Sequence, residues 1–197
     1  MDLPDETTAR LTRQAPDRGR ELRELPPGER DWSRASVTAL IEHIQRHFHA
    51  RHREQLPALV RLAGRVEQLH GAHADCPHGL AELLMAMQQQ LESHMMKEEQ
   101  ILFPLLERNP GAVCQGPMAV IHAEHGELDA AVQRVRQLLD GGRLPHEAGE
   151  AWRTLYKGLA QFEDELRRHM HLENDILFEA VARAARSERE AGQGDRQ

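Results

Sequence analysis

Two copies of a short histidine–glutamate motif are the part of the sequence best suited to chemistry. One copy runs from His94 to Phe103 and the other from His169 to Phe178; both fit the pattern HMxxExxILF, 75 residues apart. Residues four apart in a helix lie on one face, so each copy can present an imidazole and a carboxylate to a common point. The apolar triplet that ends each copy indicates that this face is directed toward a core.

The two pairs in these copies, His94–Glu98 and His169–Glu173, predict a metal site. A single HxxxE sequence on a helix usually makes a surface ion pair, but two copies in equivalent places favour a shared function. A buried carboxylate is costly unless it is neutralised, and divalent cations would neutralise both carboxylates.

Each half of the repeat is expected to supply one more ligand from its preceding helix. His125 precedes His169 by 44 residues and His49 precedes His94 by 45, and this matched spacing selects His49 and His125. His52 is the alternative in the first half, because it lies one turn further along nearly the same face. The other histidines of these helices, expected to be exposed or satisfied by neighbours, are His43, His47 and His122.

His70 is excluded by distance if its helix is continuous. It lies 21 residues beyond His49, which is roughly 31 Å along a helix, whereas the ions of a two-metal site lie roughly 3.5–4 Å apart. It could reach the site only if the chain folded back near Pro57 or Gly64. The histidines expected at loops or on another helix face are His73, His78, His146 and His171.

Four imidazoles and two carboxylates form the predicted ligand set, namely His49, His94, Glu98, His125, His169 and Glu173. Two metal ions would each receive two imidazoles and share both carboxylates as bridges. Such a set on a helical bundle suits a di-iron or di-manganese centre, with open positions for an oxo or hydroxo bridge and for O₂ or NO. A structural zinc site would be closed and mononuclear, and an iron–sulfur cluster would need thiolates.

Gly and Pro divide the central part of the chain into four long helical segments. These run from Ser33 or Ser36 to about His70, from after Pro77 to about Arg108, from near Gly116 to Gly141, and from after Pro145 to about Arg186. Strand signals are weak, and short loops favour an all-α, up-down-up-down antiparallel four-helix bundle. Pro57 and Pro104 are expected to kink or end their helices.

The bundle is expected to occupy residues 32–186. Residues 1–31 are polar and rich in proline, which predicts a flexible N-terminal arm without a cysteine-bearing domain. Residues 187–197 are expected to form a disordered tail.

Composition limits the classes of function. The charge is −7, from 25 basic and 32 acidic residues, which argues against a nucleic-acid or anionic-membrane surface. We find no transmembrane run and no secretory signal, and the lone Cys76 and Cys114 fit a reducing cytoplasm. Motifs of serine hydrolases, nucleotide-binding proteins and HExxH metalloproteases are absent from the sequence.

Longer stretches of sequence resemble a known family. The segments FHARHREQLPAL at 48–59, SHMMKEEQILFPLLE at 93–107 and GPMAVIHAEHGEL at 116–128 are similar to hemerythrin-like (HHE) di-iron proteins. The closest branch is the di-iron proteins of iron–sulfur cluster repair (RIC) and their NO-binding relatives. The resemblance covers about residues 31–182.

This resemblance implies a hemerythrin-like fold and two non-haem iron ions on the six predicted ligands, with Glu98 and Glu173 as bridges. It implies a role in nitrosative or oxidative stress, either binding NO or supplying iron to damaged iron–sulfur apoproteins. Reduction of NO to N₂O, which needs an electron donor, is left open, as is the choice between monomer and homodimer. Residues 1–31 lack the adjacent cysteines common in the family, which favours NO binding over thiol-dependent transfer of iron.

A rival interpretation is an O₂-binding or O₂-sensing module without turnover. Hemerythrins proper use a fifth imidazole, which His52 or a folded-back His70 could supply. Side chains that could line a dry gas path, or simply fill the core, are Met95, Met96, Met170 and Phe103.

Overall fold

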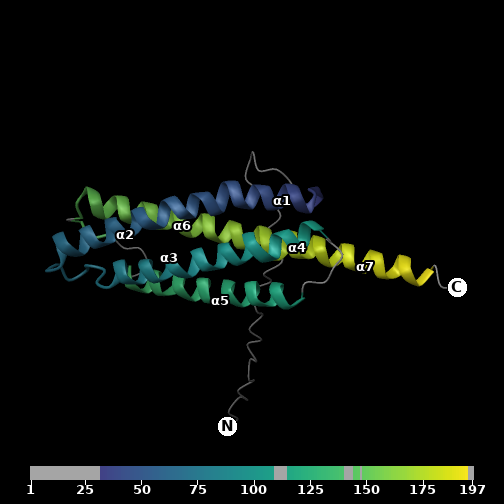
Figure 1. Ribbon diagram of the computed structural model, residues 1–197. Helices are drawn as coiled ribbons and strands as arrows, with labels where there is room; N and C mark the ends of the chain where they lie inside the picture. Colours follow the sequence, from purple (N-terminus) through teal and green to yellow (C-terminus); the bar gives the residue numbers. More distant parts are fainter. Residues whose placement is uncertain (1–31, 109–114, 140–143, 147, 195–197) are drawn as a thin grey trace, which may run out of the picture. The chain divides into compact units, whose positions relative to one another are not determined.

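The computed structural model describes residues 32–108, 115–139, 144–146 and 148–194. All regular elements in these residues are helices, which lie side by side as four rods (Figure 1). The predicted all-α, four-helix bundle is confirmed. The segment predicted as an N-terminal arm, 1–31, lies outside the described residues, as do 195–197 of the predicted tail.

Three of the four rods are built from two α-helices joined by a π-helical turn. The first rod is α1 (Val37–Ile44), η2 (Gln45–His49) and α2 (Ala50–His70), preceded by the short 3₁₀ turn η1 (Trp32–Arg34). The second is α3 (Leu80–Lys97), η3 (Glu98–Leu102) and α4 (Phe103–Arg108). The third is α5 (Gln115–Leu138), and the fourth is α6 (Glu150–His171), η5 (Leu172–Leu177) and α7 (Phe178–Gly194).

Local sequence explains where the rods begin. Of the two candidate caps, Ser36 is the one that starts α1: its backbone is extended and its side chain accepts a hydrogen bond of 3.2 Å from the Ala39 N–H. Gly79 precedes α3 with φ of 82°, a left-handed conformation that glycine adopts without strain.

Each π-turn inserts an extra residue into one of these three rods. In all three, the residue after the turn donates its N–H to the carbonyl five residues back, as Phe103 does to Glu98. The extra residue rotates the following helix relative to an unbroken α-helix, so both halves of a rod can face the core. Each turn contains one predicted ligand: His49, Glu98 or Glu173.

The structure bears on three sequence expectations about helix ends. Pro57 lies inside α2, which continues past it to His70. Pro104 does not end its rod either, because it directly follows the π-turn η3 at the start of α4. The last rod continues to Gly194, so the stretch 187–194, expected to belong to a disordered tail, is helical.

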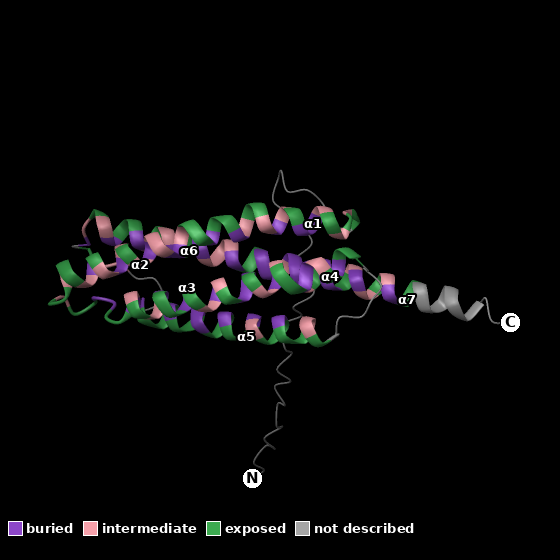
Figure 2. Ribbon diagram, viewed as in Figure 1, coloured by how far each residue is buried: buried purple, intermediate pink, exposed green. Residues whose placement is uncertain are grey.

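The buried side chains form two separate apolar clusters. Buried and exposed residues alternate along the rods (Figure 2). The larger cluster contains Leu56, Leu91 and the buried Met95, and the smaller contains Ile44 and Phe103. The predicted ligands lie between the clusters along each rod, as polar positions in the middle of an apolar core.

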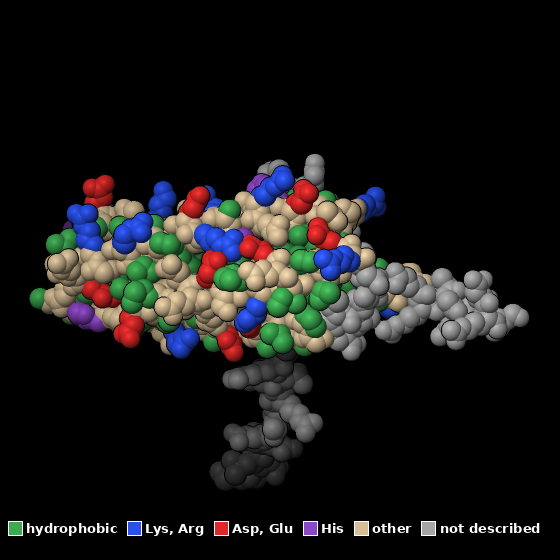
Figure 3. Space-filling view, in the orientation of Figure 1, with side chains coloured by type: hydrophobic (Ala, Val, Ile, Leu, Met, Phe, Trp, Pro, Cys, Tyr) green, Lys and Arg blue, Asp and Glu red, His purple; other side chains and the backbone are tan. Residues whose placement is uncertain are grey.

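The outer face carries charges of both signs, mixed rather than separated (Figure 3). Ion pairs join neighbouring rods across this surface, for example Arg51 with Glu165 at 2.7 Å and Arg136 with Glu163. None of the described helices combines the length with the apolar composition needed to cross a membrane.

Leu84→Ala tests the packing of the larger cluster. Leu84 is fully buried, and its truncation should lower the free energy of unfolding by about 3 kcal/mol, through lost burial and the cavity left behind. Met85, its neighbour, is 48% exposed, so Met85→Ala should change stability by less than about 0.5 kcal/mol. Urea denaturation followed by circular dichroism measures both, and equal effects of the two variants would contradict this packing.

Candidate metal centre

All four rods contribute to one buried polar cluster at the middle of the bundle. The structure brings together all six predicted ligands, each at most 3% exposed: His49, His94, Glu98, His125, His169 and Glu173. They come from η2, α3, η3, α5, α6 and η5 respectively. The cluster therefore depends on the packing of every rod.

The cluster divides into two groups that share both carboxylates. The first group contains His49 and His169 and the second contains His94 and His125, and each group also includes Glu98 and Glu173. Within a group, the candidate ligand atoms all lie within 4.8 Å of one another. This arrangement could hold two cations, one in each group, with both carboxylates common to the two positions.

The imidazoles approach each other in a way that suits a cation. The Nε2 atoms of His49 and His169 are 3.1 Å apart, and those of His94 and His125 are 3.2 Å apart. Two nitrogens that are each about 2.1 Å from one ion lie about 3.0–3.4 Å apart. Between two neutral imidazoles, by contrast, one shared proton is the most that such a contact can hold.

The carboxylates link the two groups. Glu173 Oε1 lies 2.9 Å from His169 Nε2, and its Oε2 lies 3.1 Å from His125 Nε2. Glu98 Oε2 lies 3.3 Å from His49 Nε2 and farther, 3.5 Å, from His94 Nε2. Each carboxylate thus touches one imidazole of each group.

Glu98 is the clearest sign that the cluster is built for a cation. Neither of its carboxylate oxygens has a hydrogen-bond partner, although the side chain is fully buried. Such a group would cost several kcal/mol in an apolar core unless it were neutralised. The donor set and its burial therefore fit a pair of metal ions.

Burial and mutual repulsion set the pKa values of the two carboxyls in opposite directions. Burial, together with the charge of Glu173, holds the pKa of Glu98 well above its usual range. Burial alone would also raise the pKa of Glu173, but His169 and His125 outweigh it and hold that pKa well below the usual range. Without a cation, the cluster therefore holds one protonated and one ionised carboxyl.

Two of the four imidazoles, those of His49 and His94, are held neutral, which is the form that binds metals. Burial lowers the pKa of His49 and of His94 to about 4. Burial would lower the pKa of His125 as well, but its hydrogen bond to Glu173 and the charge of that carboxylate raise it. A neutral imidazole whose Nε2 faces the centre carries its proton on Nδ1, where it can donate to an outer acceptor.

Three of the four imidazoles have such an acceptor. His49 Nδ1 donates to Glu99 Oε1 at 2.7 Å. His94 Nδ1 donates to Glu124 Oε2 at 3.1 Å. His125 Nδ1 donates to the amide oxygen of Asn174 at 3.0 Å.

The two outer carboxylates are themselves fixed by basic side chains at the surface. Arg53 donates to Glu99 at 2.9 Å, and Lys97 pairs with Glu124. Partial burial would raise the pKa of each carboxyl, but these hydrogen bonds and charges hold both pKa values below the usual range. Glu99 and Glu124 therefore remain charged acceptors, which orient the imidazoles firmly.

Sequence reasoning missed these outer partners, although a signal exists. Glu99 follows the predicted ligand Glu98, Glu124 precedes His125, and Asn174 follows Glu173. A polar residue next to a ligand in the chain lies at the edge of the buried face and can reach the imidazole of the neighbouring rod. Finding it requires knowing which rods are neighbours, and a single sequence does not supply that.

His169 is the exception. Its Nδ1 is buried without a hydrogen-bond partner. Phe48, which precedes His49 in the chain, stacks on the His169 ring with centroids 5.5 Å apart and planes 8° apart. His169 thus packs against an aromatic ring and has no polar partner at Nδ1.

His52, the alternative ligand, lies beside the cluster but in neither group of candidate ligands among the described residues. It is fully buried, and its ring lies 5.3 Å from that of His169 and 5.4 Å from that of Phe162. Neither of its ring nitrogens has a hydrogen-bond partner. Burial lowers the pKa of His52 to about 3.

Three other histidines lie away from the ligand groups. His70 packs against Trp152 at a centroid distance of 5.0 Å, at the end of α2 remote from His49. His43 stacks on Trp32 at 4.1 Å, and the exposed His122 lies 3.2 Å from the amide oxygen of Asn174.

Comparison with known proteins identifies the class to which this fold and cluster belong. The model of the hemerythrin HHE cation-binding domain matches residues 40–181, and the chain belongs to this family. It is 43% identical over 163 residues to the iron-sulfur cluster repair protein YtfE of Pectobacterium atrosepticum, covering 83% of this chain and 74% of the relative. It is 44% identical over 158 residues to the protein of the same name from Edwardsiella ictaluri, covering 80% and 72%.

The lowered pKa values predict how the metal-free protein responds to acid. His49, His52 and His94 stay neutral in the fold down to about pH 4 or lower, whereas in the unfolded chain they take up protons below about 6.5. The raised pKa values of Glu98 and His125 act in the opposite direction and offset part of this uptake. Stability should therefore fall as the pH drops from 6.5 toward 4.5, by about 2–3 kcal/mol per pH unit.

Urea denaturation of the metal-free protein at several pH values in this window measures the slope. His52→Leu should reduce it by about one proton, or about 1.4 kcal/mol per pH unit. Stability that stayed constant or rose on acidification would contradict the neutral state of these imidazoles.

Proposed function

We propose that the buried cluster binds two iron ions and that the protein serves in iron–sulfur cluster repair under nitrosative stress, as a centre that binds NO. The observation that carries the proposal is the pair of cation positions with two common carboxylates. Bound iron would supply affinity for NO and for O₂ at the positions that the protein leaves open.

The proposed ligands are two imidazoles for each ion, from His49 and His169 at one position and from His94 and His125 at the other. Glu98 and Glu173 would bridge the ions, because each touches an imidazole of both groups. Iron is favoured over manganese by the four nitrogen donors, since manganese prefers a set dominated by oxygen.

The chain's own residues would do three things for such a centre. Glu99 and Glu124 orient two of the imidazoles from outside. The two apolar clusters on either side exclude water, which strengthens the electrostatic attraction between the carboxylates and the ions. The π-turns place His49, Glu98 and Glu173 on the inner face without ending the rods.

The repair role is supported by the names of the relatives, which are iron-sulfur cluster repair proteins. The proposal includes a cytoplasmic setting, an electron donor and iron–sulfur apoproteins as partners. Cys76, the described cysteine, is buried in the larger apolar cluster rather than at the metal centre. NO binding, which needs only the metal site, is therefore favoured over transfer through a thiol.

Glu98→Ala tests the bridging role. Removing a carboxylate common to both positions should lower the iron content from two ions per chain to well below one, because both ions lose a ligand. Glu107→Ala, an exposed position further along the same rod, is the control and should keep both ions. Iron is measured by elemental analysis after anaerobic loading, and a Glu98→Ala protein that retained two ions would refute the assignment.

The response to gases separates NO binding from O₂ carriage. The ferrous protein is mixed with NO and, separately, with O₂, and its optical spectrum is followed. Tight binding of NO with no reversible oxygenation is expected, since the described residues of neither group include a fifth imidazole. Reversible oxygenation with weak binding of NO would favour the O₂-binding alternative.

A further inference from the structure

The two cation positions differ in how firmly their imidazoles are held. Both imidazoles of the His94–His125 position have an outer acceptor, Glu124 or Asn174. At the His49–His169 position only His49 has one. Outer hydrogen bonds fix ring orientation and increase ligand basicity, so their loss weakens metal binding. The His49–His169 position is therefore the weaker of the two.

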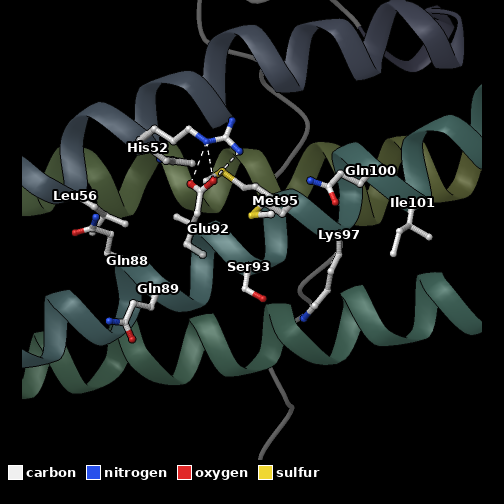
Figure 4. A pocket seen from close by; sticks show the side chains of 13 residues that line it. His52, Leu56, Gln88, Gln89, Glu92, Ser93, Met95, Lys97, Gln100 and Ile101 are labelled. Carbon is white, nitrogen blue, oxygen red and sulfur yellow. Dashed lines mark hydrogen bonds and ion pairs between the residues drawn. The ribbon is translucent and has the colours of Figure 1, made fainter.

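His52, whose ring packs on that of His169 at this position, also lines a cavity that opens to the surface. The cavity, of about 720 Å³, is lined by residues of α2, α3 and η3 (Figure 4). Polar side chains at its wall include Gln88, Glu92 and Ser93, and Met95 adds a thioether. These are oxygen and sulfur donors of the kind that a hydrated divalent cation can exchange for water.

His52 joins this cavity to the centre. It lines the cavity, and its ring also packs on that of His169, the imidazole without an outer partner. A fully buried imidazole with both nitrogens unpartnered forgoes hydrogen bonds that water would otherwise supply, which is a real cost in a core. A role for His52 as a transient ligand of a metal ion would account for that cost.

Charge at the cavity does not oppose a cation. Arg53 is bound by two carboxylates, Glu92 at 3.0 Å and Glu99 at 2.9 Å. Lys97 pairs with Glu124. Both basic side chains of the cavity wall are thus paired with carboxylates, so neither presents an unpaired positive charge to a cation.

We propose that the cation at the His49–His169 position is the one that exchanges with solvent, and that it passes through this cavity by way of His52, whose imidazole binds it transiently. The inference rests on the proposed function, since it concerns the ions of the same centre. It adds a route for the ion and an order of release, which a protein that supplies iron would need. Neither ring nitrogen of His52 has a hydrogen-bond partner, so the lone pair of one of them is available to a cation.

Chelation kinetics test the route. Protein loaded with two ferrous ions per chain is mixed anaerobically with excess ferrozine, and the coloured complex is followed with time. The wild type should release its ions in two phases of one ion each. His52→Leu and His52→Phe should slow the fast phase by about tenfold and leave the slow phase unchanged. The control is His47→Leu, an exposed histidine of the same rod, which should change neither phase.

A second variant tests the order of release. Glu124→Gln removes the charged acceptor of His94, so it should weaken the other position by about 10- to 100-fold and speed the slow phase alone. Circular dichroism and the iron content at equilibrium establish that each variant is folded and fully loaded.

The outcomes distinguish this inference from the proposed function. If the wild type binds no metal, the proposed function fails. If it binds two ions but the His52 variants release both at the wild-type rates, the proposed route is wrong, whereas the proposed two-metal centre is still supported. If a folded His52 variant holds only one ion at equilibrium, His52 is a permanent ligand and the transient role is overturned.

Discussion

The structure depends on the cost of placing two carboxylates among four buried imidazoles in the middle of an apolar core. No rod could bury Glu98 or Glu173 alone, because the free-energy cost of an unpaired buried charge would exceed the stabilisation from the apolar packing around it. The cost is shared when all four rods meet, and the proposed cations would supply the missing positive charge. Metal binding and the closure of the bundle are therefore expected to stabilise each other.

The backbone is adapted to this constraint. In a long, continuous α-helix, the face that is directed toward the core at one end gradually turns away from the core along the helix. The ligands of the polar centre must nevertheless point inward, without displacing the apolar residues on either side of them. The π-turns η2, η3 and η5 absorb this shift at the level of the centre. As a result the two apolar clusters, one on each side, can each be well packed.

The fold and the six residues of the inner cluster could be predicted from the sequence, because the patterns that indicate them are local or occur twice. The i, i+4 spacing and its copy 75 residues later predict His94, Glu98, His169 and Glu173 from helix geometry alone. The matched spacing adds His49 and His125, and the structure brings all six together, although binding of metal by them stays a prediction. The outer acceptors and the burial of His52 depend on which rods are neighbours. The π-turns could not be predicted, because no particular residue type marks a π-turn in the sequence. The helix over 187–194 was not predicted either, because its polar composition is typical of a disordered tail.

The outer partners also show how far the two halves have diverged. The residue before the first imidazole is Phe48 in one half and Glu124 in the other, and the residue after the bridging position is Glu99 or Asn174. A chain made of two second halves would give every imidazole a polar neighbour, whereas two first halves would leave two of them against phenylalanine. The repeat thus preserves the ligands but neither the charges beside them nor the π-turn of the first rod, so the halves are not interchangeable.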